Sequence, residues 1–290
     1  MIGHPVAHSR SPAMQRAAFD ALGLAARYEL WDTAPDDLPA RVASLRARGM
    51  LGANVTIPYK LSVMSLLDRM APAAEQVAGA VNTIVRERAG GRVRLVGYNT
   101  DIAGLEALLL EAGTWPTGRR VLVLGAGGTA RAVVGLAARE GAAELMVAAR
   151  RVDQALEVLG ATQAAQALGG QPPRSIMGMA LTDAGMLAMA LASCDLLVNT
   201  TPVGTGDPDA SPIPLELLAR LPHGACVLDV IYAPPETALV RAARAAGHTA
   251  RGGLTMLLHQ GAAAFELWTG HAAPLAAMRA ALAASLAAGE

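Results

Sequence analysis

The stretch VLVLGAGGTARAVVGLAA, residues 121–138, decides the fold of this chain. It opens with a continuous apolar run, which is typical of a strand buried on both faces of a parallel sheet. Gly125, Gly127 and Ala130 follow in GxGxxA spacing, and an apolar helical stretch begins at once. The first glycine allows a tight turn, the second lets the backbone approach a pyrophosphate, and the small third residue lets the helix pack on the sheet. The stretch therefore predicts a strand, turn and helix that bind a dinucleotide, and a tight turn without a ligand is the alternative.

Two arginines favour one dinucleotide over the other. About twenty residues after the glycines, where NAD-binding proteins usually present a carboxylate to the ribose hydroxyls, the chain has Ala148-Ala149-Arg150-Arg151. Guanidinium groups suit a 2′-phosphate by charge and by their planar donor geometry. We therefore predict NADP as the cofactor. The alternative is that one or both arginines cap the next helix or face solvent.

The rest of the chain divides into two patterns. Three further apolar runs, at 144–149, 194–199 and 225–231, alternate with Ala-rich helical stretches and predict a doubly wound parallel sheet. The first hundred residues alternate strand-like and helix-period stretches, which predicts a separate α/β domain. Its expected strands are 28–33, 51–57, 80–85 and 92–98, and its expected helices are 35–48 and 59–70. Further helices are expected at 102–112, 254–268 and 272–288.

Composition excludes several classes of partner and site. The chain has 24 basic and 24 acidic residues, and no basic stripe with interleaved aromatic residues indicates a nucleic-acid partner. Cys194 and Cys226 lie in apolar runs and are expected to be small core residues. No histidine or cysteine spacing indicates a metal. The start of the sequence lacks a signal-peptide pattern and the apolar stretches are too interrupted to span a bilayer, so we expect a cytoplasmic protein.

Lys60 is the only lysine among the 24 basic residues, and arginine fills every other position. Arginine serves wherever a positive charge alone is needed, but it cannot give up its proton near neutral pH, whereas lysine can. A single lysine in such a chain therefore indicates acid–base chemistry. The alternative is chance survival on a solvated face.

Four polar clusters surround this lysine in the first hundred residues: His8-Ser9-Arg10-Ser11-Pro12, Asn54-Val55-Thr56-Ile57-Pro58-Tyr59-Lys60, Val81-Asn82-Thr83 and Asn99-Thr100-Asp101. Each lies at the end of an expected strand or the start of a helix. Because such ends converge on one crevice of an open α/β sheet, we expect the clusters to line one pocket. The local alternatives are helix caps at Ser9, Thr56 and Asp101 and a turn at Asn82.

These motifs resemble, in order, those of the shikimate dehydrogenase family. The resemblance rests on HSRSP, GANVTIPYK, GAVNT, NTD, GAGGTARA, NTTPVGT, DVIYAPPET and MLLHQGAAAFELWTG, which cover nearly the whole chain. It implies a two-domain α/β protein that reversibly reduces 3-dehydroshikimate with NADPH. It also implies that residues 1–101, completed by the helices of 253–290, bind the substrate, while residues 102–252 form a Rossmann-type NADP-binding domain.

The resemblance implies a role for each matching residue. Lys60 and Asp101 are expected to be catalytic, with Lys60 exchanging a proton with the substrate oxygen while the nicotinamide carries the hydride. The expected substrate-binding residues are Ser9 and Ser11, for the carboxylate, and Thr56, Asn82, Tyr232 and Gln260. The expected cofactor-binding residues are Gly125, Ala126, Gly127, Gly128, Thr129, Ala130, Arg150, Arg151, Thr201 and Gly253.

Two other functions stay open at this point. A quinate dehydrogenase shares the scaffold, although Ser11 and Arg150 disfavour it, and a dinucleotide-sensing module without turnover would need only the cofactor turn. A hydrolase is disfavoured because the chain has neither a GxSxG nor an HExxH motif. We expect a small-molecule substrate, no membrane partner, and a homodimer as the candidate assembly.

Overall fold

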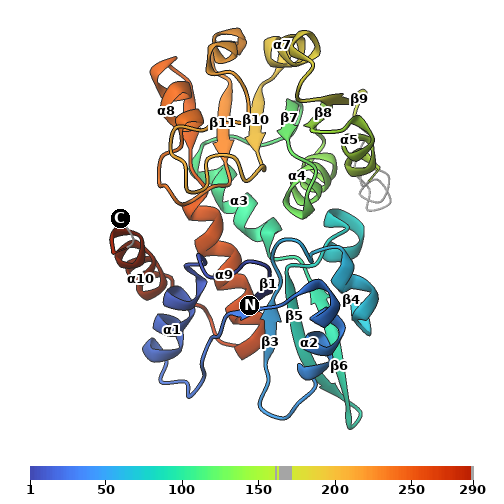
Figure 1. Cartoon of the computed structure of the whole chain (residues 1–290), viewed down its shortest axis with the longest axis vertical. Helices are drawn as coiled ribbons and strands as arrows, with labels where there is room; N and C mark the ends of the chain where they lie inside the picture. The colour runs from blue at the N-terminus through green and yellow to red at the C-terminus, as the bar shows by residue number, and fades with distance from the viewer. Residues whose placement is uncertain (161, 163–171, 289–290) are drawn as a thin grey trace. The chain divides into compact units, whose positions relative to one another are not determined.

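The computed structural model describes residues 1–160, 162 and 172–288. The chain forms two compact units (Figure 1). Unit 1 comprises Met1–Glu75, Ala80–Gly104 and Leu257–Glu290, and unit 2 comprises Gln76–Gly79 and Leu105–Met256. Unit 1 is therefore built from both ends of the chain. The limits between the units fall within helices α3 and α9, which are Asp101–Glu111 and Leu254–Thr269, and within and just after the π-helical segment η3, Ala73–Ala78.

Unit 2 contains a six-stranded parallel sheet in the order β12-β11-β10-β7-β8-β9. The strands are β7 Arg120–Leu124, β8 Glu144–Ala149, β9 Ser175–Ala180, β10 Leu196–Asn199, β11 Cys226–Asp229 and β12 Thr249–Arg251. The chain runs outward from β7 in one direction and then, from β10, in the other, which is the strand order of the Rossmann fold. The predicted fold class is confirmed. β9 and β12 were not predicted, and they are the two edge strands.

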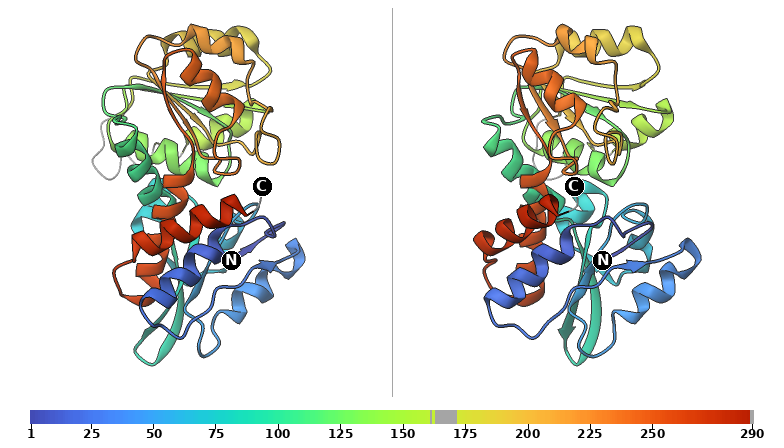
Figure 2. Two further views of the ribbon diagram at one scale, coloured as in Figure 1. Left: turned by 90° about the vertical axis from the view of Figure 1, so that its left-hand side faces the viewer. Right: turned by 60° about the vertical axis from the view of Figure 1, so that its left-hand side comes forward.

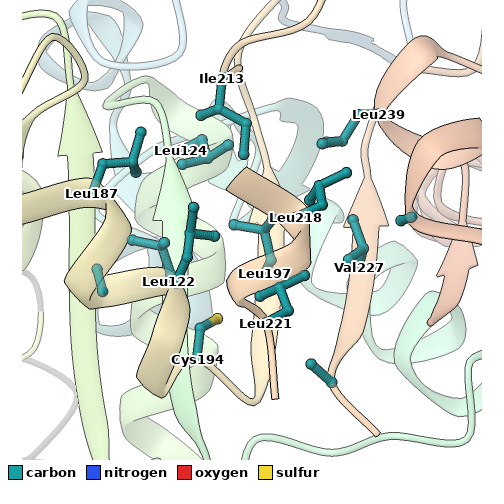
Figure 3. Close-up of a cluster of buried hydrophobic side chains, with 14 of the residues drawn as sticks. Leu122, Leu124, Leu187, Cys194, Leu197, Ile213, Leu218, Leu221, Val227 and Leu239 are labelled. Carbon is teal, nitrogen blue, oxygen red and sulfur yellow. The ribbon is translucent and has the colours of Figure 1, made fainter. Parts of the chain in front are cut away.

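Helices cover both faces of this sheet. They are α4 Gly128–Arg139, α5 Val152–Leu159, α7 Ala184–Ser193, the 3₁₀ helix η4 Leu215–Arg220 and α8 Ala238–Ala245. Leu122 and Leu197 point to one face and pack with residues of α7, η4 and α8 (Figure 3). Val121 and Val198 point to the other face, toward side chains of α3 and α4. Because both faces are buried, the four central strands β7, β8, β10 and β11 are largely apolar, as the sequence indicated.

Unit 1 contains a four-stranded mixed sheet, in the order β3-β5-β6-β4, and a short parallel pair, β1 and β2. Its strands are β1 Ile2–Gly3, β2 Trp31–Asp32, β3 Gly52–Asn54, β4 Arg69–Met70, β5 Thr83–Ala89 and β6 Arg92–Tyr98. β5 and β6 form an antiparallel hairpin, and β3 is antiparallel to β5. The predicted helix over 59–70 is wrong in its second half. Only a 3₁₀ helix, η2 Ser62–Leu66, forms within that range, and the chain then pairs with β6 as β4.

The remaining helices of unit 1 come from distant parts of the sequence. They are α1 Ser11–Ala21, η1 Pro35–Asp37, α2 Leu38–Ser44 and α10 Leu275–Ala287, and a π-helical segment, η3, covers Ala73–Ala78. α1 and α10 lie side by side (Figure 2). Phe19 on α1 also packs on Phe265 of α9, with ring centroids 5.4 Å apart. These contacts place the C-terminal helices against the N-terminal part of the chain.

Candidate functional site

Lys60 and Asp101 form an ion pair in unit 1. The Lys60 Nζ lies 2.6 Å from Oδ2 of Asp101, and the two side chains are 13% and 6% exposed. The second carboxylate oxygen of Asp101 accepts a hydrogen bond of 2.7 Å from the Asn82 amide. Both oxygens of the carboxylate are therefore engaged, which holds Asp101 in one orientation next to the lysine. This is the arrangement needed for a positioned proton carrier.

The antiparallel hairpin brings these residues together. Thr83, the first residue of β5, pairs with Tyr98, the last residue of β6, and Asn54, the last residue of β3, pairs with Thr83. Asn82 and Asp101 therefore lie just beyond the ends of these strands, at the same end of the sheet. Of the four clusters expected to converge, three do so here, those that carry Lys60, Asn82 and Asp101, and the predicted cause was wrong. The start of one strand and the ends of its two antiparallel neighbours meet, rather than the carboxyl ends of parallel strands.

Three further residues belong to this network, although we did not predict a role for them. Asn54 donates 3.0 Å to the Thr83 hydroxyl, which donates 3.1 Å to Oδ1 of Asn82. The main-chain N–H of Thr100 donates 2.7 Å to the same oxygen. All are buried. Each lies within a motif quoted above, and buried polar side chains in so apolar a unit require partners. That requirement is the signal that could have identified them.

The expected carboxylate site at the start of α1 has unpaired donors. The Ser9 hydroxyl accepts a 3.2 Å hydrogen bond from the main-chain N–H of Ser11. The Ser11 hydroxyl and the Arg10 Nε are buried, yet neither has a hydrogen-bond partner among the described residues. Arg10, the N-cap residue of α1, makes no side-chain cap hydrogen bond. Because unpaired buried donors are costly, this group of residues fits an anionic ligand, and Arg10 is an addition to the predicted set.

The other expected substrate residues are placed as follows. Thr56 follows β3 and is half-buried, and its main-chain N–H donates to Ile2 O over 2.9 Å. Gln260 lies on α9, is 9% exposed, and donates 3.0 Å to Leu257 O of its own helix. Tyr232 follows β11 in unit 2 and is half-buried. The structure therefore places two of these residues in unit 1 and the third in unit 2.

The glycine turn of unit 2 leads into α4 without a side-chain cap. Gly125 has φ +106°, and a Cβ there would lie 2.7 Å from the Thr200 hydroxyl, so this position requires glycine. Gly127 is the N-cap of α4 and makes no side-chain cap bond, and a Cβ on it would meet nothing within 4 Å. Gly125 follows β7 and Thr200 follows β10, where the strand order reverses. Open α/β sheets bind ligands at this point.

The other residues of the expected cofactor set surround the turn or follow nearby strands. Ala130 is fully buried, as helix packing on the sheet requires, while Ala126, Gly128 and Thr129 are half-buried. A Cβ on Gly253 would lie 2.0 Å from Val230 O. The close approach to Val230 alone explains a glycine at position 253, so its contact with a cofactor stays a prediction.

The two arginines after β8 differ. Arg151 forms a bidentate ion pair with Asp153, whose carboxylate raises the pKa of Arg151. The Arg150 side chain is exposed and has no hydrogen bond or ion pair within the described part of the chain. Arg150 is therefore available to a phosphate, whereas Arg151 would have to leave Asp153 first.

Thr201 belongs to a buried network that sequence reasoning missed. Its hydroxyl donates 2.8 Å to Oδ1 of Asn199, and the Asn199 amide donates 3.0 Å to Asp229. Thr237, the N-cap of α8, donates 2.7 Å to the other Asp229 oxygen. Burial raises the pKa of Asp229, against the opposing effect of these donors. Asp229 therefore links β10, β11 and α8, and through Asn199 it is connected to the loop that carries Thr201.

Other chemistries have little support in the described residues. Cys194 and Cys226 are buried free thiols, as predicted, and burial raises the pKa of Cys194 to about 12. Within residues 1–160, 162 and 172–288, no three His, Cys, Asp or Glu side chains are grouped so that they could hold a metal ion. In the same residues no helix has the length and apolar character needed to cross a membrane.

Known proteins resemble this chain over its whole length. The family model of the shikimate dehydrogenase substrate binding domain matches residues 1–84, and that of the shikimate 5′-dehydrogenase C-terminal domain matches 253–283. A shikimate dehydrogenase (NADP(+)) from Symbiobacterium thermophilum is 46% identical over 99% of this chain and 93% of its own length.

Two solved structures show the same fold. The shikimate 5-dehydrogenase from Thermus thermophilus, in complex with NADP(H) and shikimate, has a TM-score of 0.81 and 37% identity, with 98% of both chains covered. The quinate dehydrogenase from Corynebacterium glutamicum, in complex with NAD, has a TM-score of 0.83 and 30% identity, with 98% of this chain and 97% of that chain covered. The identity over nearly the full length shows that this chain belongs to the shikimate dehydrogenase family.

Proposed function

We infer that this protein is an NADP-dependent shikimate dehydrogenase, which interconverts 3-dehydroshikimate and shikimate. The observation that carries this proposal is the buried contact between Lys60, the only lysine, and Asp101, whose other oxygen is held by Asn82. It occurs in a chain that is 46% identical to a curated shikimate dehydrogenase. A module that only sensed a dinucleotide would have no need for this network in unit 1.

Lys60 is the proton carrier of the proposed reaction. During reduction its ammonium group donates a proton to the oxygen that develops negative charge, and during oxidation the amine accepts the hydroxyl proton. Asp101 orients the lysine and can accept a hydrogen bond from a substrate hydroxyl. Asn82 keeps the Asp101 carboxylate in place through its 2.7 Å hydrogen bond. NADPH, when bound, supplies the hydride.

The start of α1 binds the substrate carboxylate in this proposal. Ser9 and Ser11 supply hydroxyl groups, and Arg10 supplies a buried Nε that has no partner in the described residues. An ionised acceptor strengthens such hydrogen bonds. The ring hydroxyls or the carboxylate are proposed to contact Thr56, Asn82, Gln260 and Tyr232. These contacts would distinguish shikimate from simpler alcohols.

The residues of unit 2 fit a dinucleotide. The N-terminus of α4 has no side-chain cap and Gly127 leaves space in front of it, as a pyrophosphate requires. The pyrophosphate of the dinucleotide would be held by Gly125, Ala126, Gly127, Gly128, Thr129 and Ala130. Arg150 would bind the 2′-phosphate, with Arg151 as a second donor. Thr201 and Gly253 would lie along the nicotinamide half.

The two units receive separate roles in this proposal. Residues 1–101 with 253–290 bind substrate and exchange the proton, and residues 102–252 bind NADP. We also propose that the protein acts in the cytoplasm and that a homodimer is its candidate assembly. Size-exclusion chromatography with light scattering measures the mass in solution and would show a monomer if the last proposal fails.

A four-way assay tests the proposed function. The absorbance of the reduced cofactor is followed with shikimate or quinate, each with NADP or NAD. We expect the highest kcat/KM with shikimate and NADP. A preference for quinate with NAD would establish the quinate dehydrogenase instead. Cofactor binding with no turnover of either substrate would establish a dinucleotide-sensing module.

A further inference from the structure

Tyr28 lies at the far end of the hydrogen-bond network that reaches Lys60. This residue precedes β2 in unit 1 and is 6% exposed. Its hydroxyl donates a 2.6 Å hydrogen bond to Oδ1 of Asn54. Its ring also packs on Trp268, with centroids 6.0 Å apart, and the Trp268 indole donates 3.0 Å to Ile84 O of β5. The phenol is therefore held against the sheet and aimed at Asn54.

The direction of donation is consistent along the whole network. Because Tyr28 donates to the oxygen of Asn54, the Asn54 amide nitrogen points to the Thr83 hydroxyl, at 3.0 Å. Thr83 accepts that bond, and its own hydroxyl lies 3.1 Å from Oδ1 of Asn82 and 3.0 Å from the Thr100 hydroxyl. With its oxygen engaged, Asn82 directs its nitrogen to Asp101, at 2.7 Å. The Asn82 amide also lies 3.0 Å from the Thr100 hydroxyl, so Thr100 is a side branch of this path.

We propose that Tyr28 is a positioning residue for catalysis, acting through Asn54, Thr83 and Asn82 on the Asp101 carboxylate that holds Lys60. The inference rests on the proposed function. In this role Tyr28 acts on Asp101 through the intervening side chains. The phenol sets the orientation of the Asn54 amide. If this amide were flipped, its nitrogen would face the phenol, and the Thr83 hydroxyl would lose the N–H group that donates to it. Buried hydrogen-bond networks transmit such preferences because unpaired polar groups are costly within them.

The effect of Tyr28 is smaller than that of Lys60. Asn82 also accepts a 2.7 Å hydrogen bond from the main-chain N–H of Thr100, which holds part of its orientation without Tyr28. One neutral hydrogen bond removed from the network corresponds to a fall in kcat of about three- to tenfold. The Tyr28→Phe variant removes only the hydroxyl and keeps the ring that packs on Trp268.

A double-mutant cycle tests the proposal with Tyr28→Phe and Thr83→Val, which removes the next hydroxyl along the path. We expect kcat of the double variant to lie within about twofold of Thr83→Val alone, since the path is already broken there. KM for shikimate stays within about twofold in Tyr28→Phe, and the midpoint of its pH profile of kcat moves. If Thr83→Val does not fold, Asn54→Ala takes its place in the cycle.

Tyr98→Phe is the matched control. It also removes a phenol from the sheet of unit 1, but its hydroxyl donates 3.0 Å to Glu87 and has no part in the path. We expect its kcat and pH profile to match the wild type. The proposal fails if kcat and the pH profile of Tyr28→Phe match those of the wild type, or if the effects of the two substitutions on kcat are additive. It also fails if the lower rate of Tyr28→Phe is fully explained by a smaller amount of folded, active enzyme. A wild type without shikimate turnover would instead refute the proposed function.

Discussion

The Lys60 network of unit 1 and the glycine turn of unit 2 present their polar groups in opposite ways. In unit 1, the side chains of Lys60, Asp101 and Asn82 bind one another and are nearly closed to solvent. In unit 2, the turn from Gly125 to Gly127 presents main-chain groups, and the start of α4 has no side-chain cap. Unit 1 therefore holds its reactive group in place before a substrate arrives, whereas unit 2 leaves its donors for the ligand.

This difference assigns different consequences to mutations. In the proposed function the side-chain network of unit 1 orients the proton carrier, so a change in it is expected to alter the rate of proton transfer. A change in the turn of unit 2 alters the affinity for the dinucleotide, because the turn contributes its backbone. The two units are thus expected to separate kcat from cofactor binding.

The largest effect is expected at Lys60. Lys60→Ala removes the proton carrier and should lower kcat at least about 100-fold, with a modest change in KM for shikimate. Steady-state kinetics on purified protein measures both constants. Turnover near that of the wild type would show that another group moves the proton.

Lys60→Arg is the matched variant for this prediction. It keeps the positive charge next to Asp101, so the buried carboxylate stays paired. Arginine cannot give up its proton at neutral pH. We therefore expect kcat for oxidation of shikimate to fall as far as in Lys60→Ala. Recovery of activity by arginine would mean that the charge alone is needed.

Gly125 and Gly127 should separate folding from binding in unit 2. Gly125→Ala forces a Cβ into a backbone with φ +106° and against the Thr200 hydroxyl, which is itself bonded to Leu124 O over 2.7 Å. We expect the free energy of unfolding to fall by about 1–3 kcal/mol. Urea denaturation measures this change.

Gly127→Ala meets nothing within 4 Å in the protein, so its free energy of unfolding should change by less than about 1 kcal/mol. Its Cβ would occupy the space needed by a pyrophosphate, and we expect Kd for NADPH to rise about tenfold or more. If Gly127→Ala binds NADPH as tightly as the wild type, the pyrophosphate does not approach this turn.

The choice of dinucleotide depends on an exposed arginine and should show a smaller effect. Arg150→Gln removes a guanidinium that has no partner in the described residues, and we expect KM for NADP to rise about tenfold with KM for NAD unchanged. Arg151→Gln should change less, because Arg151 is already paired with Asp153. Equal changes for NADP and NAD in Arg150→Gln would exclude a contact with the 2′-phosphate.

The smallest effect on stability is expected at one ion pair in each unit. Arg120 in unit 2 makes a bidentate pair with Asp195 and also donates its main-chain N–H, over 2.9 Å. These hydrogen bonds hold the pKa of Asp195 below its ordinary value. Arg46 and Asp68 form the corresponding pair in unit 1, with both side chains more exposed.

Asp195→Asn should lower the free energy of unfolding by about 1 kcal/mol at neutral pH, since the pair is partly screened by solvent. A lowered pKa means that this stabilisation is present above the unfolded pKa of the carboxyl and is lost as the pH falls through the folded one. The difference from the wild type should therefore vanish in acid. A larger loss in Asp68→Asn would contradict the order expected from exposure.

The central strands of unit 2 could be predicted, while its edge strands could not. β7, β8, β10 and β11 are buried on both faces, so their apolar runs are visible in the sequence. β9 and β12 lie at the edges. Ile176 in β9 is 54% exposed, and β12 has three residues including Arg251, so neither shows a continuous apolar run.

The site was predictable in its residues but not in its connections. The single lysine and the polar motifs indicated Lys60, Asp101 and Asn82 because those residue types are unusual in so apolar a chain. Asn54, Thr83 and Thr100 lie in the same motifs, but their residue types are common at turns and helix caps, so the sequence did not distinguish a shared role from these local ones. Their shared role depends on the register of an antiparallel hairpin, which pairs residues far apart in sequence.

The separation of proton transfer from cofactor binding is tested most directly by a fluorescence titration of the Lys60→Arg variant with NADPH. We expect Kd within about twofold of the wild type, because the substitution leaves unit 2 unchanged, in a protein whose kcat has fallen at least about 100-fold. A Kd that weakens in proportion to the loss of kcat would contradict the division of roles between the two units.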